Sequence, residues 1–372
     1  MRLTRLGILA ATLALFLSSA AAQTSQLAAS SSALDANYVT IDKGLTGMTW
    51  DGKEFIASYG ISNVPLINVS LDGQKVTPFA PKFVGKDECY AAVSQGKAGF
   101  PAGYLYVNLD PSVYQIDPTG NSVTVFSTPP GSSRIAYVAF DTVGTWGYAL
   151  FALDDNGLLW SIKSDGTAKV IGDLSVFANE QSSRLGLKPE GIAVAPQTFG
   201  AFAGYLFVTL EGAGRILAIA PNDTKVMPVA MMPGEEPERV LQIPAASDLY
   251  AAEFDTGARV RIPAANFTNY VGSLLVITEG ENEPFGSFTV LQPTGSGITM
   301  TRIGNVTGRP HYEGASFVSS TASATGTQSM STSSTGPAGS VITPVLAGGA
   351  ALLVAVVVLV VFFISRRGGK SL

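Results

Sequence analysis

An internal repeat constrains the fold of this 372-residue chain more than any other feature. Groups of four β-strand signals, separated by Gly, Pro and Asp turns, recur with a period of roughly 45 residues. The legible copies, the last of them interrupted, span residues 46–81, 88–128, 134–173, 190–230 and 249–304. A four-stranded unit that is apolar on both faces must stack against its neighbours, and a closed ring protects its edges. The repeat therefore predicts an all-β propeller of four-stranded antiparallel blades.

Two further segments bear on the number of blades. The segment HYEGASFV, residues 311–318, resembles the first strand of a blade but stands alone after the last copy. We expect it to complete a blade with N-terminal residues 38–42 and so to close the ring. The segment ERVLQI, residues 238–243, is an extra strand candidate between copies. Six blades are therefore favoured, with five as the alternative; a β-sandwich would not explain the four-strand period.

The N-terminal end has the pattern of a secretory signal. Two Arg residues precede a short apolar run and then a tract of small residues, which predicts a signal peptide over residues 1–22. The apolar run is too short to cross a bilayer. Residues 23–36 are rich in Ser and Ala and predict a flexible leader before a propeller ectodomain at residues 37–318.

The C-terminal end predicts a membrane anchor. Residues 319–341 are rich in Ser, Thr and Gly, which is typical of an extended stalk. The apolar run that follows covers ~30 Å at ~1.5 Å per residue, so we expect a transmembrane helix over residues 342–365. Basic residues then mark 366–372 as a cytoplasmic tail of a single-pass type I cell-surface protein. A GPI signal is the alternative, although charges after the apolar run count against it.

The charge of the exported part indicates which partners it suits. Five of the 23 Lys and Arg residues lie in the two ends, which leaves 18 against 28 Asp and Glu, a net charge near −10. An acidic surface of this kind disfavours nucleic acid and anionic membranes as partners. We expect instead an extracellular protein, peptide or glycan ligand, or a cation.

Modification sites are consistent with export. Four asparagines begin N-x-Ser/Thr sequons and are candidate glycosylation sites: Asn68, Asn222, Asn266 and Asn305. Cys89 is the only cysteine, so no intrachain disulfide can form, and we expect a buried, inert thiol.

Many enzyme classes are excluded by the residues that the chain lacks. With His311 as the single histidine, there is no HExxH zinc motif and little basis for a Ser-His-Asp triad. The chain also has no G-x-S-x-G elbow, Walker A loop or CxxC pair. We expect His311 to be a loop or surface residue. A quinoprotein sugar dehydrogenase, which is expected to need a catalytic histidine, is disfavoured for the same reason.

The best candidate site is a set of carboxylates at the starts of first strands: Glu88, Glu190, Glu238 and Glu313. In a propeller the first strand of each blade lines the central channel, so these side chains would meet at one mouth of it. Converging carboxylates repel each other unless a hard cation neutralises them, and oxygen ligands suit Ca²⁺. The alternative is that they are solvated loop residues without a ligand.

The best-preserved copy carries a family resemblance. Its segments PEGIAV, GYLFV and GRILAI, within residues 189–219, resemble the repeat of six-bladed NHL and SMP-30/gluconolactonase-like propellers. The resemblance extends over most of residues 38–318 and implies the fold. It also implies a divalent metal on the axis beside a Glu-Gly dipeptide, which Glu190-Gly191 and Glu313-Gly314 match. The Asn and Asp ligands of that family have no counterpart that we can place here.

Two functions from different classes follow. The first is a membrane-tethered propeller that binds a protein, peptide or glycan ligand and has no catalytic activity. The second is a tethered SMP-30-like hydrolase that uses a divalent metal to cleave a lactone or an ester. The two hypotheses differ at the channel mouth, where the enzyme needs an open pocket with Glu190 and Glu313 pointing into it.

Overall fold

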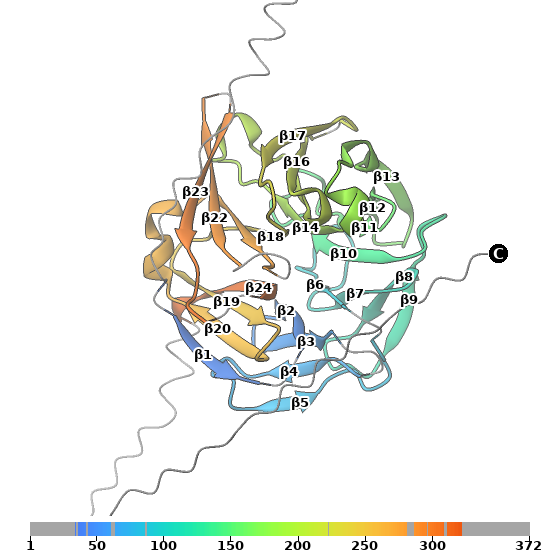
Figure 1. Ribbon diagram of the computed structural model, residues 1–372. Helices are drawn as coiled ribbons and strands as arrows, with labels where there is room; N and C mark the ends of the chain where they lie inside the picture. Colours follow the sequence, from blue (N-terminus) through green and yellow to red (C-terminus); the bar gives the residue numbers. More distant parts are fainter. Residues whose placement is uncertain are drawn as a thin grey trace, which may run out of the picture. The chain divides into compact units, whose positions relative to one another are not determined.

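The structure is a computed structural model that describes residues 34–321 apart from 35, 42–43, 61–63, 86–87, 222, 281–285, 296 and 309–310. Within these residues the chain forms six four-stranded antiparallel sheets arranged around a central axis (Figure 1). The strands β2, β6, β10, β14, β18 and β24 contact one another around the ring and are the inner strands. The prediction of six blades is confirmed.

The first four blades each use four consecutive strands. Blade 1 contains β2 (Leu45–Trp50), β3 (Phe55–Tyr59), β4 (Ile67–Val69) and β5 (Val76–Pro78). Blade 2 contains β6 (Ala91–Val93), β7 (Leu105–Leu109), β8 (Ser112–Ile116) and β9 (Val123–Ser127). Blade 3 contains β10 (Ile135–Phe140), β11 (Leu150–Asp154), β12 (Leu158–Ile162) and β13 (Ala168–Asp173), and blade 4 contains β14 (Pro189–Val194), β15 (Leu206–Leu210), β16 (Arg215–Ile219) and β17 (Val226–Met231). These blades correspond to the first four copies of the repeat.

The last two blades exchange strands in a way that the repeat did not predict. Blade 5 contains β18 (Pro237–Gln242), β21 (Leu274–Thr278), β22 (Phe288–Thr294) and β23 (Gly297–Gly304). Blade 6 contains β24 (Tyr312–Ser319), β19 (Ser247–Glu253), β20 (Ala258–Ile262) and β1 (Asn37–Thr40). The predicted fifth copy at residues 249–304 is therefore wrong as a single blade, and the extra strand at 238–243 is the inner strand of blade 5. Both β18 and β19 mix apolar with charged residues and are largely buried, so their local sequence patterns did not show which of them is an inner strand.

The ring closes through the predicted pairing of the two chain ends. Strand β24 begins the last blade and β1 is its outer strand, with β19 and β20 between them. Asn37 lies opposite Arg261 and Thr40 lies opposite Ala258 in the outer pair. The N-terminal strand thus covers an edge that would otherwise be open.

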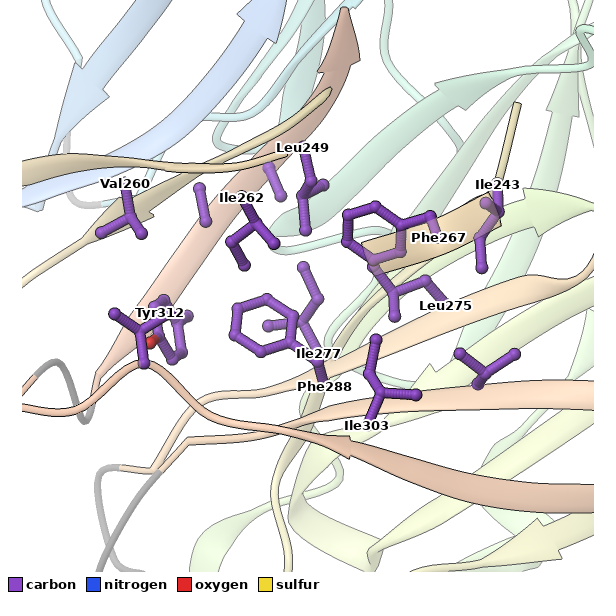
Figure 2. Close-up of a cluster of buried hydrophobic side chains, with 14 of the residues drawn as sticks. Ile243, Leu249, Val260, Ile262, Phe267, Leu275, Ile277, Phe288, Ile303 and Tyr312 are labelled. Atoms are coloured by element: carbon purple, nitrogen blue, oxygen red, sulfur yellow. The ribbon is translucent and has the colours of Figure 1, made fainter. Parts of the chain in front are cut away.

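The hydrophobic core is divided among the interfaces between blades. The described residues contain six clusters of buried apolar side chains, one between each pair of neighbouring blades. The cluster between blades 5 and 6 packs Phe267, Phe288 and Tyr312 together (Figure 2). In β15, Leu206 and Val208 face blade 3 while Phe207 faces blade 5, because successive side chains of a strand alternate in direction.

Short helices occupy some of the connections. The α-helix α2 spans Ser182–Leu185, and the 3₁₀ helices are η1 (Ser175–Phe177), η2 (Gly200–Phe202), η3 (Glu211–Ala213) and η4 (Ala264–Tyr270). No helix in this part of the chain is long and apolar enough to span a bilayer. The predicted signal peptide, transmembrane helix and tail lie outside the described residues, as do most of the leader and the stalk.

The modification sites occupy varied positions. Asn68 lies in β4, Asn266 in η4 and Asn305 after β23, and all three side chains are half-buried; Asn222 lies outside the described residues. Their glycosylation stays a prediction. Cys89 is buried between blades 1 and 2, as expected.

Candidate metal centre at the propeller axis

An acidic pocket of about 380 Å³ lies at the end of the axis where the inner strands begin. It is lined chiefly by charged side chains: Glu88, Arg134, Asp155, Lys188, Glu190, Glu211, Glu238, Glu279 and Glu313. Five of these carboxylates are almost completely buried: Glu190, Glu211, Glu238, Glu279 and Glu313. The mouth of the channel is therefore an open pocket whose walls carry an excess of negative charge.

Glycines explain how the inner strands bring their carboxylates together. A Cβ atom at Gly191 would lie 2.8 Å from the backbone nitrogen of Val240 in the next blade. A Cβ atom at Gly314 would lie 2.4 Å from the carbonyl oxygen of Thr46. Only glycine permits these close approaches, so each Glu-Gly dipeptide holds its glutamate against the neighbouring blade at the axis.

The four carboxylates predicted from the sequence all line this pocket, although they are not equivalent. Glu190, Glu238 and Glu313 lie in β14, β18 and β24 and are 5%, 1% and 3% exposed. Glu88 precedes β6, is 31% exposed in its side chain and forms an ion pair of 3.7 Å with Arg134. Three of the four predicted residues thus belong to the buried centre, and Glu88 belongs to the rim.

Two buried carboxylates of the pocket were not predicted. Glu211 follows β15 and Glu279 follows β21, the second strands of blades 4 and 5. Both are followed by glycine, in LFVTLEG and LLVITEG, so a second Glu-Gly pattern existed in the sequence and was a usable signal. Lys188 donates to Glu211 Oε1 at 2.6 Å and partly neutralises it.

His311 is also part of the site, which corrects the expectation of a surface residue. It does lie in a loop, but it is only 8% exposed. Its Nε2 lies 2.9 Å from Glu313 Oε1 and 3.0 Å from Glu279 Oε1. Burial opposes a charge on the ring, yet these two carboxylates raise the pKa of His311 to about 11. The sequence placed it near Glu313 but could not reveal that Glu279 would meet it from another blade.

A buried arginine closes the inner side of the pocket. Arg239 Nη2 lies 2.7 Å from Glu238 Oε1, and Nη1 donates to the carbonyl oxygen of Glu190 at 2.6 Å. Its guanidinium carbon lies 3.8 Å and 4.6 Å from the ring centres of Tyr90 and Tyr137. Cation–π contact and the ion pair together compensate for burying this charge.

A second pocket of about 230 Å³ lies beyond this arginine. Tyr137 lines it, together with later residues of all six inner strands, among them Thr49, Val93, Leu241 and Ser316. Because inner strands run in one direction along the axis, this pocket opens toward the opposite end of the propeller. Its lining is largely apolar in residue type, in contrast to the acidic mouth.

The acidic pocket is short of positive charge. Burial raises the pKa of Glu190 and Glu238 well above the usual range, and it raises that of Glu211 to about 7 and that of Glu279 to about 8. Three cations, Lys188, Arg239 and His311, face the five buried carboxylates. If all eight groups were ionised, the centre would carry a net charge of −2, which one divalent cation would balance.

Unsatisfied oxygens test whether a metal would fit. Glu190 Oε2 and Glu279 Oε2 are among the buried side-chain atoms of the described residues that have no hydrogen-bond partner. Because both residues line the pocket, these two oxygens are available to a ligand. Carboxylate oxygens of Glu211, Glu238 and Glu279 also lie within 4.8 Å of one another. An all-oxygen set with free lone pairs suits a hard cation such as Ca²⁺.

Comparison with known proteins identifies similar folds but no family. No protein-family model and no curated protein matches the sequence. A structure of virginiamycin B lyase from Staphylococcus aureus is 16% identical, with a TM-score of 0.46 over 75% of this chain and 77% of that one. A chain of a nidogen/laminin complex is 15% identical, with a TM-score of 0.48 over 74% of this chain and 85% of that one. The calcium-binding protein regucalcin from Agrobacterium tumefaciens is 13% identical, with a TM-score of 0.45 over 76% of this chain and 81% of that one.

These likenesses concern the fold alone, and what the other proteins bind is not transferred to this chain. The ring of six four-stranded blades rests on the strand pairing described above. That pairing alone gives the chain a six-bladed propeller fold.

Proposed function

We propose that this protein is a divalent-metal-dependent hydrolase whose acidic pocket binds Ca²⁺ and acts on a small lactone or ester. The observation that carries the proposal is the pair of buried, unpartnered oxygens on Glu190 and Glu279 inside an open pocket. Leaving such an oxygen unsatisfied costs about 1–3 kcal/mol, and a bound cation would recover this cost.

The residues suited to hold the cation are Glu211, Glu238 and Glu279. Their oxygens already lie within 4.8 Å of one another, and all three side chains are buried. When bound, the cation would supply Lewis-acid polarisation of a carbonyl group. Arg239 keeps Glu238 in place through its 2.7 Å ion pair, so the cation set is supported from the inner side of the pocket.

The rim suits a substrate that carries strongly polar groups. Arg134 and Lys188 have side chains that are 31% and 39% exposed and both line the pocket, where Arg134 pairs with Glu88 and Asp155 and Lys188 pairs with Glu211. They border a cavity of about 380 Å³, which has the size of a small-molecule site. A lactone of a sugar acid has the polarity and size that this lining would accept.

Glu190 is suited to take a proton from the attacking water. It lines the pocket, its Oε2 has no hydrogen-bond partner among the described residues, and its burial raises its pKa well above the usual range. A higher pKa makes the carboxylate a stronger base once it is ionised. The backbone of Glu190 is held by Arg239 through the 2.6 Å bond to its carbonyl oxygen.

The test combines a calcium titration with a hydrolysis assay on the purified protein. Calorimetry would follow the melting temperature as Ca²⁺ is added, and a pH-stat assay would use a panel of sugar-acid lactones and aryl esters. A hundredfold excess of Ca²⁺ over its Kd should add about 2.7 kcal/mol to the free energy of unfolding. Glu211→Gln and Glu279→Gln should lose the stabilisation, and Glu190→Gln should lose hydrolysis while still binding Ca²⁺.

Glu180→Gln is the matched control, because Glu180 is an exposed carboxylate outside the pocket. It should keep both the calcium response and the hydrolysis. Absence of any calcium response in the unaltered protein would contradict the cation site. A calcium response without hydrolysis of any lactone or ester would leave the cation site standing and refute the hydrolase.

A tethered interaction module is the second candidate. The observation that favours it is the pocket of about 230 Å³ at the opposite end of the axis, where an extracellular protein, peptide or glycan could bind. In either case we infer a cell-surface setting, anchored through residues 342–365 on the stalk at 319–341. The high calcium concentration outside cells would keep a weak site occupied.

A further inference from the structure

We propose that Glu279, His311 and Glu313 form a second cation position in the acidic pocket, one that takes a first-row transition ion such as Zn²⁺ in preference to Ca²⁺. The proposed function leaves His311 without a role, although it is buried among carboxylates. The second position rests on the proposed calcium site only through Glu279, which the two positions share.

The arrangement of donor atoms supports this assignment. One ring nitrogen and two carboxylate oxygens, one from each residue, lie within 4.8 Å of one another, and all three residues are buried. His311 Nε2 lies 3.0 Å from Glu279 Oε1 and 2.9 Å from Glu313 Oε1, so the three groups converge on a common point, where an ion would displace the proton that the ring shares with the two carboxylates. Mixed imidazole and carboxylate ligands are typical of Zn²⁺ and its neighbours, whereas Ca²⁺ takes oxygen ligands.

The other nitrogen of the ring is held as it is in metal-binding histidines. His311 Nδ1 lies 3.4 Å from Asp255 Oδ1, and the ring packs on Phe254 with 4.8 Å between ring centres. Histidine ligands of metals commonly donate their second nitrogen to a carboxylate, which fixes the orientation of the ring. Asp255 would therefore position His311 without touching the ion.

The backbone makes the cluster a built site. The amide of Tyr312 donates to the carbonyl oxygen of Glu279 at 3.0 Å, which ties the end of β21 to the start of β24. The amide of Phe254 donates to the carbonyl oxygen of His311 at 2.9 Å. Glu279 Oε2 is buried without a hydrogen-bond partner among the described residues, so it has a lone pair free for a ligand. Glu313 Oε2 accepts from Tyr90, which leaves Oε1 for the cluster.

The shared glutamate implies that two cations can be bound together. Glu279 belongs both to the all-oxygen group with Glu211 and Glu238 and to the mixed group with His311 and Glu313. A carboxylate with two oxygens can bridge two ions, as in enzymes with two-metal sites. Glu279 is thus the residue through which a hard and a borderline cation would be bridged.

The experiment uses the full-length protein, stripped of metal by chelation and prepared without a histidine tag. Zn²⁺ and Ca²⁺ are titrated separately by calorimetry. His311→Gln should weaken Zn²⁺ binding by tenfold or more and change the Kd for Ca²⁺ by less than threefold. Asp255→Asn should weaken Zn²⁺ binding about tenfold without abolishing it. Glu211→Gln should show the reverse pattern, with loss of Ca²⁺ and retention of Zn²⁺.

X-ray absorption of the unaltered protein loaded with Zn²⁺ keeps the inference testable if a variant does not fold. His311 is the only histidine of the chain, so imidazole scattering around the zinc can come from no other residue. Zinc bound through oxygen alone, or equal zinc affinity in His311→Gln, would overturn the inference. Loss of calcium binding with zinc binding intact would instead overturn the proposed function and leave this position standing.

Discussion

Replacing Arg239 with methionine tests whether the buried charges of the pocket are mutually dependent. Methionine keeps an unbranched apolar side chain but removes the positive charge and all hydrogen-bond donors of the guanidinium group. Arg239 is 2% exposed and its ion-pair partner Glu238 is 1% exposed, so solvent cannot take over the role of the lost cation. The carbonyl oxygen of Glu190 also loses its 2.6 Å donor.

The size of the effect follows from these contacts. Removing one member of a buried ion pair typically costs about 3–5 kcal/mol, because the other charge stays buried without compensation. Contact of the guanidinium with the rings of Tyr90 and Tyr137 adds up to about 2 kcal/mol. We therefore expect Arg239→Met to lower the free energy of unfolding by roughly 3–7 kcal/mol at neutral pH and without calcium. Adding Glu238→Gln should recover part of this loss.

Urea unfolding followed by tryptophan fluorescence measures the change. Arg184→Met is the control, because Arg184 is exposed on α2, and it should change the free energy by less than about 0.5 kcal/mol. A loss below about 1 kcal/mol for Arg239→Met would refute the reasoning. So would a double variant that is no more stable than Arg239→Met alone, because the penalty would then not come from the stranded carboxylate.

Three further predictions concern pH, packing and ring closure. In the metal-free protein, the folded pKa is raised to about 8 for Glu279 and to about 11 for His311, so the folded state holds protons that the unfolded state releases. Stability should therefore fall as the pH rises from about 5, near the unfolded pKa of Glu279, to about 11, the folded pKa of His311, and calcium should flatten this slope. Calorimetry across pH would show a rising trend if the sign is wrong. Gly191→Ala should lower the free energy of unfolding by about 1–3 kcal/mol, because the added Cβ would lie 2.9 Å from the carbonyl oxygen of Glu238. An unchanged midpoint of urea unfolding would contradict that contact. Deleting residues 34–40 removes β1 and exposes the edge of β20, which should promote pairing between molecules. Size-exclusion chromatography should then show oligomers, and a stable monomer would argue against closure by this strand.

The sequence was informative about blade architecture because each blade is a local unit. In blades 1–4 the four strands follow one another, and short turns join neighbours, so the pattern of apolar runs and turn residues maps directly onto the sheet. The glycine that opens second strands is one such local rule. Gly204 has a φ of 72° before β15, and a Cβ there would lie 2.6 Å from Thr145 Cγ2.

The pairing in blades 5 and 6 could not be predicted in the same way. The hairpin β19–β20 interrupts blade 5 and joins a sheet with β24 and β1, which are distant in sequence. Strands β18 and β19 are both buried enough to be inner or second strands. Whether β18 or β19 pairs with β21 depends on contacts between blades, and the spacing of apolar residues along the sequence does not specify such contacts.

In the candidate site, too, local sequence predicted some residues and long-range contacts decided the others. Glu190, Glu238 and Glu313 were predicted because inner strands line the axis, and that follows from the repeat alone. Glu279 and His311 come from different blades, and only closure of the ring places them 3.0 Å apart. Their mutual burial, and with it the raised pKa of Glu279, arises from that closure.

By itself the sequence determined a propeller with acidic residues at the starts of its inner strands, since strand period, turn chemistry and Glu-Gly spacing are local properties. The tertiary structure decided which strands share a blade, which carboxylates are buried together and which oxygens lack partners. The physical reason is that burial and charge balance depend on contacts between blades: the five carboxylates and three cations come from blades 4, 5 and 6 and meet only at the axis that these blades share.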